Sequence, residues 1–308
     1  MTPAPDSRFV SGFVSLLGRP NTGKSTLLNA LVGTKLAIVA DKPQTTRTAI
    51  QGVVNLPGAQ IVFVDTPGIH RPDTLFNKRM LETVKAALDG RDLLVFLADA
   101  TLPLTDEDRA AVEIVKSART PVLLALNKID RLKDKSRLLP LIEQYRGLHE
   151  FADFIPISAL TGEGLDVLRQ EIVKRLPEGP PYFPPDYLTD QPERFLAAEL
   201  IREKILHETR QEVPHAVAVV VERWEETPKL TRISATIYVE REGQKGIVIG
   251  AQGSRLKKIG TLARQEMELL FGRKIFLELY VKVRPKWREN PAFLNALDWR
   301  SMAGFEVS

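Results

Sequence analysis

Short apolar runs alternate with helix-like segments over the first half of the chain. The clearest runs cover residues 13–18, 61–65, 93–100, 122–127 and 154–158. Aliphatic runs without polar alternation are typical of strands buried on both faces, and so of a mostly parallel sheet covered by helices. The stretch 48–55 alternates more, which favours an antiparallel edge strand. This half of the chain therefore predicts a three-layer α/β domain with a mostly parallel six-stranded sheet.

The pattern changes in the second half. A helix-like segment at 193–210 precedes an apolar stretch at 216–224 and an alternating one at 232–240. After residue 253 an amphipathic helix is expected, ended by Gly272, with one apolar stripe formed by Leu256, Ile259, Ala263, Met267 and Leu270. In the last predicted strand, 274–283, Glu278, Tyr280 and Lys282 face away from the apolar side. The order helix–strand–strand–helix–strand predicts a small α+β unit.

A proline-rich stretch separates the two patterns. Residues 177–187 read PEGPPYFPPDY and contain five prolines. Proline cannot donate to a strand ladder and blocks a helix interior, so this stretch predicts an extended, semi-rigid linker. We expect two domains at 9–178 and 193–290, a linker at 179–192 and a C-terminal tail at 291–308.

Composition removes several classes of site. The chain is 44% hydrophobic and 27% charged, as in ordinary globular proteins, and its N-terminus lacks a signal-peptide core, so a cytoplasmic location is expected. No cysteine is present, which excludes disulfides and thiolate zinc sites. The histidines have spacings that suit no metal motif: His70, His149, His207 and His215. Residues 245–288 hold 11 Lys/Arg against 3 Asp/Glu, which favours a polyanionic partner or, alternatively, a solvated charged face.

The strongest chemical signal is GRPNTGKS at residues 18–25, between a strand and a helix. Its two glycines let the backbone turn so that successive N–H groups face phosphate oxygens. Lys24 brings positive charge to the β- and γ-phosphates, and the Ser25 hydroxyl ligates Mg²⁺. The positive end of the dipole of the helix that follows also attracts the phosphates. The nucleotide-binding residues predicted here are Gly18, Asn21, Thr22, Gly23, Lys24, Ser25 and Thr26.

Three further motifs follow at strand ends. In DTPG, Asp65 can hold Mg²⁺ through water, and the Gly68 amide can sense the γ-phosphate. In NKID, Asp130 can accept from both N1–H and the 2-amino group of guanine, a donor pair that adenine lacks. Strand ends at this edge are where open α/β sheets bind ligands. The third motif, Ser158-Ala159-Leu160, ends the next strand and offers a backbone amide to the guanine carbonyl. The remaining nucleotide-binding predictions are Asn127, Lys128, Asp130, Ser158, Ala159 and Leu160.

Together these motifs resemble those of the translation-factor-class GTPases. In that class a threonine from a mobile loop completes the Mg²⁺ shell, and the stretch KPQTTR at 42–47 corresponds to this loop. We favour Thr45, with Thr46 as the alternative. The resemblance thus implies Ser25, Thr45 and Asp65 as Mg²⁺ ligands, and Lys24, Thr45 and Gly68 as catalytic residues.

Two positions bear on the rate of GTP hydrolysis. Ile69 stands where Ras-like enzymes carry the glutamine that orients the attacking water, so we expect slow intrinsic hydrolysis. Asn21 matches the asparagine carried by similar GTPases that use potassium as a charge substitute. Potassium activation is therefore a hypothesis.

In the second domain the sequence Gly250-Ala251-Gln252-Gly253 lies between a predicted strand at 246–249 and the amphipathic helix. A lone G-x-x-G is more often a structural turn, but the fold order resembles a type II KH domain, in which this loop clamps about four nucleotides. The RNA-binding candidates are Gly250, Ala251, Gln252, Gly253, Arg255, Lys257, Lys258, Lys286 and Arg288. The alternative interpretation of the lysines is that they form the solvated face of the helix. Trp287 either stacks on a base or caps the hydrophobic core.

A GTPase domain, a proline-rich linker and a KH domain form the arrangement of the Era family. The stretches KPQTTR, DTPGIH and NKID and the run VIG-x-x-G-x-x-L-K-x-I-G at 248–260 resemble that family's versions. The resemblance implies GTP/GDP and Mg²⁺ as cofactors and binding of 16S ribosomal RNA near its 3′ end. It also implies a role in assembly of the small (30S) ribosomal subunit and peripheral association with the inner face of the cell membrane. We expect a monomer.

Other functions remain open at this point. One is a membrane-associated signalling GTPase whose second domain binds protein, although the basic block at 245–288 argues against it. A tRNA-modifying GTPase would need a further catalytic module, for which no residues remain. A P-loop ATPase or nucleotide kinase is disfavoured by NKID.

Overall fold

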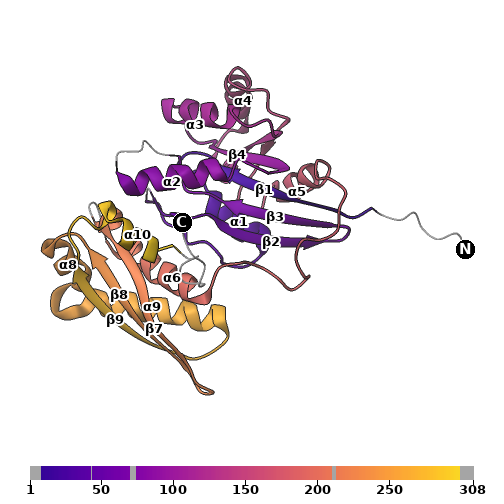
Figure 1. Cartoon of the computed structure of the whole chain (residues 1–308). Coiled ribbons are helices and arrows are strands. Elements are labelled where there is room, and N and C mark those ends of the chain that lie inside the picture. Colours follow the sequence, from indigo (N-terminus) through magenta and orange to yellow (C-terminus); the bar gives the residue numbers. More distant parts are fainter. Residues whose placement is uncertain (1–7, 43, 70–73, 210–212, 299–308) are drawn as a thin grey trace, which may run out of the picture. The chain divides into compact units, whose positions relative to one another are not determined.

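The computed structural model describes residues 8–42, 44–69, 74–209 and 213–298. The chain divides into two compact units, each described by itself below (Figure 1). The described residues of the first unit lie within Met1–Leu36, Thr46–Arg71 and Arg79–Asp190, and those of the second within Ala37–Thr45, Pro72–Lys78 and Gln191–Ser308. Two short segments from the first half of the chain thus belong to the second unit.

A six-stranded sheet forms the centre of the first unit, with the strand order β2-β3-β1-β4-β5-β6. Only β2 and β3 pair antiparallel, which confirms the mostly parallel sheet and its antiparallel edge. Every residue of β3 and β4 is buried, which is why they read as unbroken apolar runs. The strands are β1 (Val10–Leu17), β2 (Ile50–Leu56), β3 (Ala59–Asp65), β4 (Leu93–Asp99), β5 (Val122–Asn127) and β6 (Asp153–Pro156).

Helices cover both faces of this sheet (Figure 1). Buried side chains from α2 (Leu75–Ala86), α3 (Asp106–Lys116) and α4 (Leu138–Arg146) share one hydrophobic cluster with β4 and β5. The other face carries α1 (Lys24–Val32) and α5 (Leu165–Val173), and Arg169 of α5 donates to the carbonyl oxygen of Ala30 in α1. Two short 3-10 turns, η1 (Ile129–Arg131) and η2 (Lys135–Arg137), follow β5.

The proline-rich stretch lies along the edge of this sheet. The Gln60 side chain accepts hydrogen bonds from the amides of Tyr182 and Phe183 at 2.7 and 3.0 Å. Val53 N–H, on the edge strand β2, donates to the carbonyl oxygen of Leu188 at 2.9 Å. The stretch predicted as a semi-rigid linker is therefore fastened to the first unit, because the edge strand has backbone groups that need partners.

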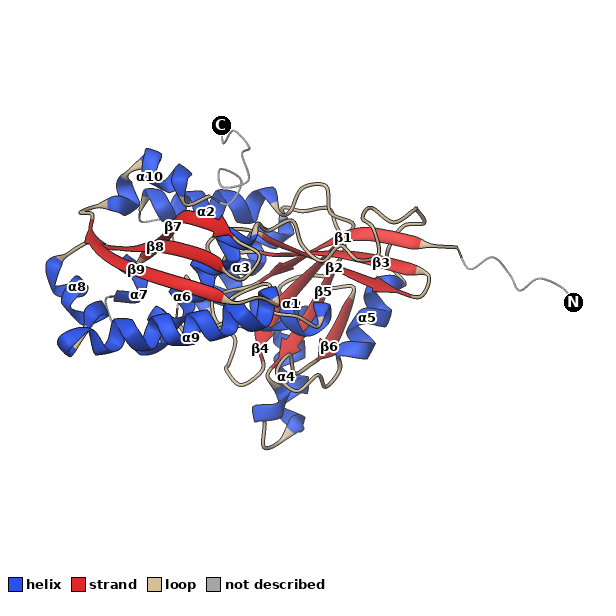
Figure 2. Cartoon of the chain, turned by 90° about the horizontal axis from the view of Figure 1, so that it is seen from below, coloured by secondary structure: helices blue, strands red, loops and turns tan. Residues whose placement is uncertain are grey.

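The second unit contains a three-stranded sheet with the order β7-β8-β9. The first pair is antiparallel and the second is parallel. Helices α6 (Glu193–Glu208) and α9 (Ser254–Phe271) pack against the sheet (Figure 2), and the predicted stripe residues Ile259, Ala263 and Met267 are fully buried. The other elements are β7 (Ala218–Glu226), β8 (Thr231–Val239), β9 (Ile275–Val283), α7 (Val213–Ala216), α8 (Glu242–Ile249), α10 (Pro291–Ala296) and the 3-10 turns η3 (Ala251–Gly253) and η4 (Trp287–Glu289).

The predicted strand at 246–249 is wrong, because these residues end helix α8. The Gln244 side-chain oxygen accepts from the backbone amides of Glu240 and Arg241 at 2.9 and 3.0 Å and so fixes the start of the helix. A four-residue apolar run fits a strand or a buried helical turn equally well. Here the hydrogen bonds of Gln244 at the start of α8 favour the helix. The G-x-x-G loop therefore joins two helices. Among the helices that the structure describes, none is both long and apolar enough to cross a membrane.

Candidate functional site

The loop Gly18–Ser25 leaves the end of β1 and enters α1, as predicted. Gly23 begins the helix with φ 98°, and a Cβ atom there would lie 2.3 Å from Asn127 Nδ2, so only glycine fits. Lys24 Nζ donates to the carbonyl oxygens of Gly18 at 3.1 Å and Arg19 at 3.0 Å. Burial lowers the pKa of Lys24 to about 8. A buried ammonium at the start of a helix suits an anionic phosphate chain.

Three oxygen-bearing side chains gather beside this loop. Ser25 Oγ donates to Asp65 Oδ2 at 2.7 Å, and Thr46 Oγ1 lies 2.7 Å from Ser25 Oγ and 3.4 Å from Asp65 Oδ2. Burial raises the pKa of Asp65 to about 6, against the opposing charge of Lys24. Asp65 Oδ1 is buried and has no hydrogen-bond partner. Hydroxyl and carboxylate oxygens with one unpaired carboxylate oxygen fit Mg²⁺, which prefers oxygen ligands.

The structure brings Thr46, rather than Thr45, to this cluster. The Thr45 hydroxyl donates within its own loop, to the carbonyl oxygens of Ala40 at 3.1 Å and Lys42 at 2.6 Å. Those two bonds close a turn within the loop and use the proton of the Thr45 hydroxyl there. The preference for Thr45 as the metal ligand therefore disagrees with the geometry, and its alternative, Thr46, agrees.

The NKID motif holds the phosphate loop from the side. Asn127 Nδ2 donates to the carbonyl oxygen of Thr22 at 2.7 Å, while Asn127 Oδ1 accepts from the amide of Ala159 at 2.9 Å. Lys128 Nζ donates to the carbonyl oxygen of Asn21 at 2.7 Å. The structure thus brings the phosphate loop and two of the predicted base-reading motifs together at the carboxyl ends of the parallel strands.

Asp130 stays exposed at this edge, and its carboxylate is oriented by a neighbour. Ser158 Oγ donates to Asp130 Oδ1 at 2.6 Å. Leu160 is 78% exposed, an unusual state for leucine. An oriented carboxylate and an uncovered apolar side chain are what a planar base with an N–H edge requires.

Two acidic residues that the sequence patterns did not single out also support the site. Asp99 Oδ2 accepts from Lys128 Nζ at 2.7 Å, and although burial opposes it, this bond and those from Thr101 lower the pKa of Asp99. Asp108 forms an ion pair with Arg19 of the phosphate loop at 2.9 Å. The signal for Asp99 was its place at the end of a buried strand. Asp108 gave no comparable signal.

Ile69 takes no part in orienting water. Its amide lies 3.4 Å from the carbonyl oxygen of Gly18, and its side chain packs against the hydrophobic cluster under α2, α3 and α4. Gly68 lies against Pro20, where an added Cβ would come within 2.8 Å of the proline. The next residue of the DTPGIH stretch, His70, lies outside the described residues.

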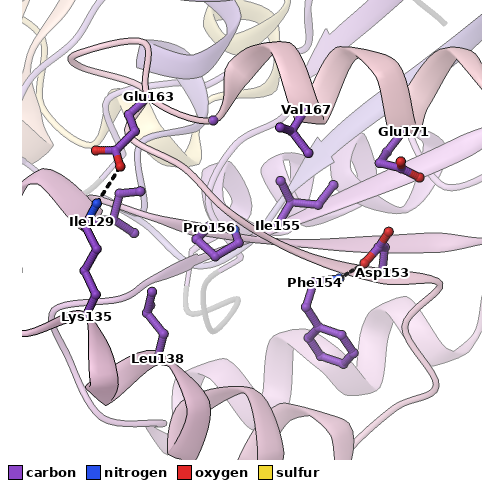
Figure 3. Close-up of a pocket in the computed structure, with 11 residues that line it drawn as sticks. Ile129, Lys135, Leu138, Asp153, Phe154, Ile155, Pro156, Glu163, Val167 and Glu171 are labelled. Atoms are coloured by element: carbon purple, nitrogen blue, oxygen red, sulfur yellow. Dashed lines mark hydrogen bonds and ion pairs between the residues drawn. The ribbon is translucent and has the colours of Figure 1, made fainter.

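A separate hollow of about 350 Å³ in the first unit lies between α4, β6 and α5 (Figure 3). Its charged side chains already have partners, because Lys135 pairs with Glu163 at 2.5 Å and Glu171 pairs with Arg175 at 2.5 Å. The apolar part of its lining is Ile129, Leu138, Phe154, Ile155, Pro156 and Val167. None of the predicted site residues lines this hollow, and we assign it no chemistry.

In the second unit a groove of about 400 Å³ lies beside the G-x-x-G loop. The loop residues Gly250, Gln252 and Gly253 all have positive backbone φ angles, of 73°, 50° and 77°. The groove is lined by Gly253, Leu256, Lys257, Gly260, Thr261, Arg264, Leu277 and Leu279. Leucines and cations in the lining of one groove suit a single nucleic-acid strand, whose bases need apolar contacts and whose phosphates need positive charge.

The basic RNA-binding candidates differ in their exposure and in the partners that their side chains already have. Lys257 lines the groove and Lys286 is exposed. Arg255 donates to the carbonyl oxygen of Ile247 beside the loop. Lys258 pairs with Glu208 at 2.9 Å but stays 59% exposed.

Arg288 and Trp287 have structural partners. The Arg288 guanidinium pairs with Glu240 at 2.7 Å, and its part in RNA binding stays a prediction. Trp287 is fully buried, and its indole N–H donates to the carbonyl oxygen of Ala216 at 2.9 Å. Trp287 therefore caps the core and does not stack on a base.

Comparisons with known proteins agree with this geometry. Residues 13–128 match the family described as 50S ribosome-binding GTPase, and residues 212–288 match the KH domain family. GTPase Era of Syntrophus aciditrophicus is 53% identical over 288 residues, which cover 93% of this chain and 94% of that one. GTPase Era of Geobacter metallireducens is 50% identical over 296 residues, covering 96% and 99%. This chain belongs to the Era family. It is a GTPase with a C-terminal KH domain.

Two solved Era structures match over nearly the whole chain. One is a variant of Aquifex aeolicus Era bound to GDP and AlF4⁻, and the other is Era in complex with MgGDPNP and nucleotides 1506–1542 of 16S ribosomal RNA. Each match has a TM-score of 0.92 and 43% sequence identity, and covers 94% of this chain and 99% of the other. Both nucleotide complexes belong to Era proteins whose fold this chain shares.

Proposed function

We propose that this Era-family GTPase binds 16S ribosomal RNA near its 3′ end through the KH groove, under control of the bound nucleotide, and assists small-subunit assembly in the cytoplasm. The observation that carries the proposal is the groove beside the G-x-x-G loop, which is lined by leucines, by Lys257 and by Arg264. Arg264 also pairs with Glu268 at 3.0 Å. A chain 43% identical over nearly its whole length is solved with nucleotides 1506–1542 of that RNA.

In this proposal the first unit holds Mg²⁺ and GTP through its strand-end motifs. Bound Mg²⁺ neutralises charge on the β- and γ-phosphates. Ser25, Thr46 and Asp65 would hold the ion, Lys24 would hold the phosphates, and Asp130 would read guanine. Because Ile69 has no polar side-chain atom, the free protein is expected to hydrolyse GTP slowly until another group positions the water.

The segment that precedes Thr46 supports nucleotide control of the KH domain. Ile38 is 2% exposed and lies in the hydrophobic core that contains α6. Val39 N–H donates to Glu203 Oε1 of α6 at 2.8 Å, and the Arg202 guanidinium donates to the carbonyl oxygen of Thr45. The chain continues directly from Thr45 to Thr46, whose hydroxyl lies at the metal site. A change at Thr46 on nucleotide exchange therefore acts on a segment that α6 holds.

Arg202→Met tests this connection. Loss of the guanidinium should leave GTP and RNA binding in place but reduce the ratio of RNA affinities between the two nucleotide states toward one, since coupling is reciprocal between sites. Arg194→Met, on the same helix, is the control and should keep the wild-type ratio. Equal ratios in Arg202→Met and wild type would contradict this route of coupling.

The proposed partner is tested by capture from total RNA. The protein is loaded with a non-hydrolysable GTP analogue or with GDP, exposed to total cellular RNA at fixed salt, and the bound RNA is sequenced. We expect enrichment of the 16S 3′ end in one nucleotide state. Indiscriminate RNA, or equal binding in both states, would contradict the proposal.

The alternative is a membrane-associated signalling GTPase whose second domain binds protein. A salt series separates the two, because phosphate contacts make RNA binding fall steeply as salt rises. A flat salt dependence, together with binding to vesicles of anionic phospholipid that RNA does not displace, would favour the alternative. Peripheral membrane association alongside RNA binding would show as the same vesicle binding together with RNA binding that falls steeply as salt rises.

Potassium activation is a further part of this proposal and rests on Asn21. This residue lies in the phosphate loop with φ 62°, and its carbonyl oxygen is held by Lys128. Turnover should be faster in potassium chloride than in sodium chloride, and Asn21→Ala should remove the difference. Equal wild-type rates in the two salts would exclude a role for potassium.

A further inference from the structure

We propose that Arg19 is a positioning residue of the phosphate loop. Its ion pair with Asp108, at the start of α3, holds the loop in the form that receives the phosphates of GDP and GTP. Arg19 occupies a variable position of the G-x-x-x-x-G-K-S pattern, so the motif itself assigns it no role.

The ion pair is almost completely buried. Arg19 Nε lies 2.9 Å from Asp108 Oδ1, and the two side chains are 12% and 2% exposed. Asp108 Oδ2 accepts from both the amide and the hydroxyl of Thr105, at 3.0 and 2.6 Å, in the capping box of α3. The acceptor of the Arg19 side chain is therefore itself fixed to the beginning of a helix.

The backbone of Arg19 holds the two neighbouring groups of the loop. Its carbonyl oxygen accepts from Lys24 Nζ at 3.0 Å and from Thr22 Oγ1 at 3.1 Å. A single residue thus carries the carbonyl that orients the phosphate-binding ammonium and the side chain that is anchored on α3. If the anchor is lost, the carbonyl and the Lys24 ammonium lose their fixed position together.

Arg19 supplies the positive charge that faces the Asp108 carboxylate. Burial, followed by the Asp108 carboxylate, raises the pKa of the nearby Tyr145 hydroxyl, so Tyr145 stays protonated: it hydrogen-bonds to Asp108 but does not balance its charge. Removing one partner of a buried ion pair leaves the other charge uncompensated. The pair therefore behaves as a unit, and either substitution should disturb the loop.

This role predicts an effect that depends on the number of phosphates. In the proposed function the guanine base is read by Asp130, in the turn η1 after β5, whereas the phosphates are received by the loop that Arg19 anchors. Loss of the anchor should weaken GDP and GTP binding and leave guanosine binding almost unchanged. A residue that merely supports the folded domain would weaken all three ligands alike.

The experiment measures dissociation constants of Arg19→Met for GDP, GTP and guanosine, by competition with a fluorescent guanine nucleotide. We expect the GDP and GTP constants to rise about tenfold or more, with faster GDP release, and the guanosine constant to stay within about twofold. Arg19→Lys should recover most of the loss, because an ammonium can still pair with Asp108. Arg109→Met removes an exposed arginine from the same helix start and should change none of the constants.

A double-variant cycle tests whether Arg19 acts through Asp108. Asp108→Asn should weaken GDP binding as Arg19→Met does, and the double variant should be little worse than either single one. Additive losses, an unchanged GDP constant in Arg19→Met, or an equal loss for guanosine would each overturn the proposal. If Arg19→Met does not fold, Arg19→Gln, which also lacks the positive charge, provides the same comparison of GDP with guanosine.

Discussion

Two loops of this protein are bounded by glycines and lead into a helix, but they are held in different ways. The phosphate loop ends at Gly23, with φ 98°, and starts α1. The G-x-x-G loop ends at Gly253, with φ 77°, and starts α9. Both glycines adopt a backbone that other residues rarely take.

The phosphate loop is fixed by residues far along the chain. Asn127 and Lys128 donate to its carbonyl oxygens, and Asp108 pairs with Arg19. The G-x-x-G loop is held by residues close to it in sequence, because the amides of Gly250 and Gly253 donate to the carbonyl oxygens of Gly246 and Gly250.

The difference matches the two kinds of ligand. A nucleotide presents one short phosphate chain, and its selective binding needs donors that are fixed in advance and enclosed. A nucleic-acid strand presents repeated phosphates and bases, so an open groove with adaptable cations is sufficient. The first loop should therefore be more sensitive to substitution than the second.

The largest expected effect is that of Gly23→Ala. A Cβ atom there would lie 2.3 Å from Asn127 Nδ2 and would break the bond from Asn127 to Thr22, so we expect GTP affinity to fall about a hundredfold or more. Gly33→Ala is the matched control. It adds the same methyl group at φ 80° with no atom within 4 Å, and should cost only some stability. Similar GTP affinities for the two variants, by nucleotide titration, would contradict the enclosed loop.

Gly253→Asp should give the next largest effect. The added carboxylate would face the groove beside Lys257 and repel phosphate, so RNA affinity should fall about tenfold or more while GTP hydrolysis is unchanged. Gly272→Asp, at the other end of α9, adds the same charge at φ 65° outside the groove. RNA binding that survives in Gly253→Asp would show that the groove is not the RNA site.

The strand-end motifs could be placed from the sequence because a strand that is buried on both faces appears there as an unbroken apolar run. All seven residues of β3 are buried, so the apolar run ends visibly at Asp65. The same holds for β5 and Asn127. Parallel strands then bring these ends to one edge without any knowledge of side-chain contacts.

Other features depend on contacts that no local pattern records. Arg19 and Asp108 are separated by 89 positions, and neither belongs to a motif that implies the other. Thr45 and Thr46 have the same side chain, and only the turn closed by Thr45 distinguishes them. Trp287 lies in a basic stretch that suggested base stacking, but its burial is decided by distant packing partners such as Phe293.

The choice between these threonines can be tested through Mg²⁺. Thr46→Val removes the hydroxyl that lies 2.7 Å from Ser25 Oγ, so the Mg²⁺ concentration for half-maximal GTP hydrolysis should rise about tenfold. Thr45→Val is the matched control and should raise it by no more than about threefold, because its hydroxyl serves the turn. A larger effect in Thr45→Val would restore the first preference and imply that the loop rearranges on binding.

The smallest predicted effect concerns the stability that the folded protein loses because the charged Asp65 carboxylate is buried. The pKa of buried Asp65 is raised from 3.8 to about 6, so the native state holds a proton more tightly than the unfolded chain. The penalty for its charge is complete above pH 6 and absent below the unfolded value of 3.8. Asp65→Asn should therefore stabilise the nucleotide-free protein at pH 8 relative to wild type, with the advantage lost near pH 4.

We expect this advantage to be roughly 1 kcal/mol, although a shift of about two pKa units corresponds to as much as ~3 kcal/mol. The gain is reduced because the neutral asparagine oxygen accepts hydrogen bonds from Ser25 and Thr46 more weakly than the charged carboxylate does. Urea unfolding in EDTA measures the difference, with exposed Asp186→Asn as the control. A difference independent of pH would mean that the buried charge does not destabilise the site, and the contrast with the open KH groove would then rest on geometry alone.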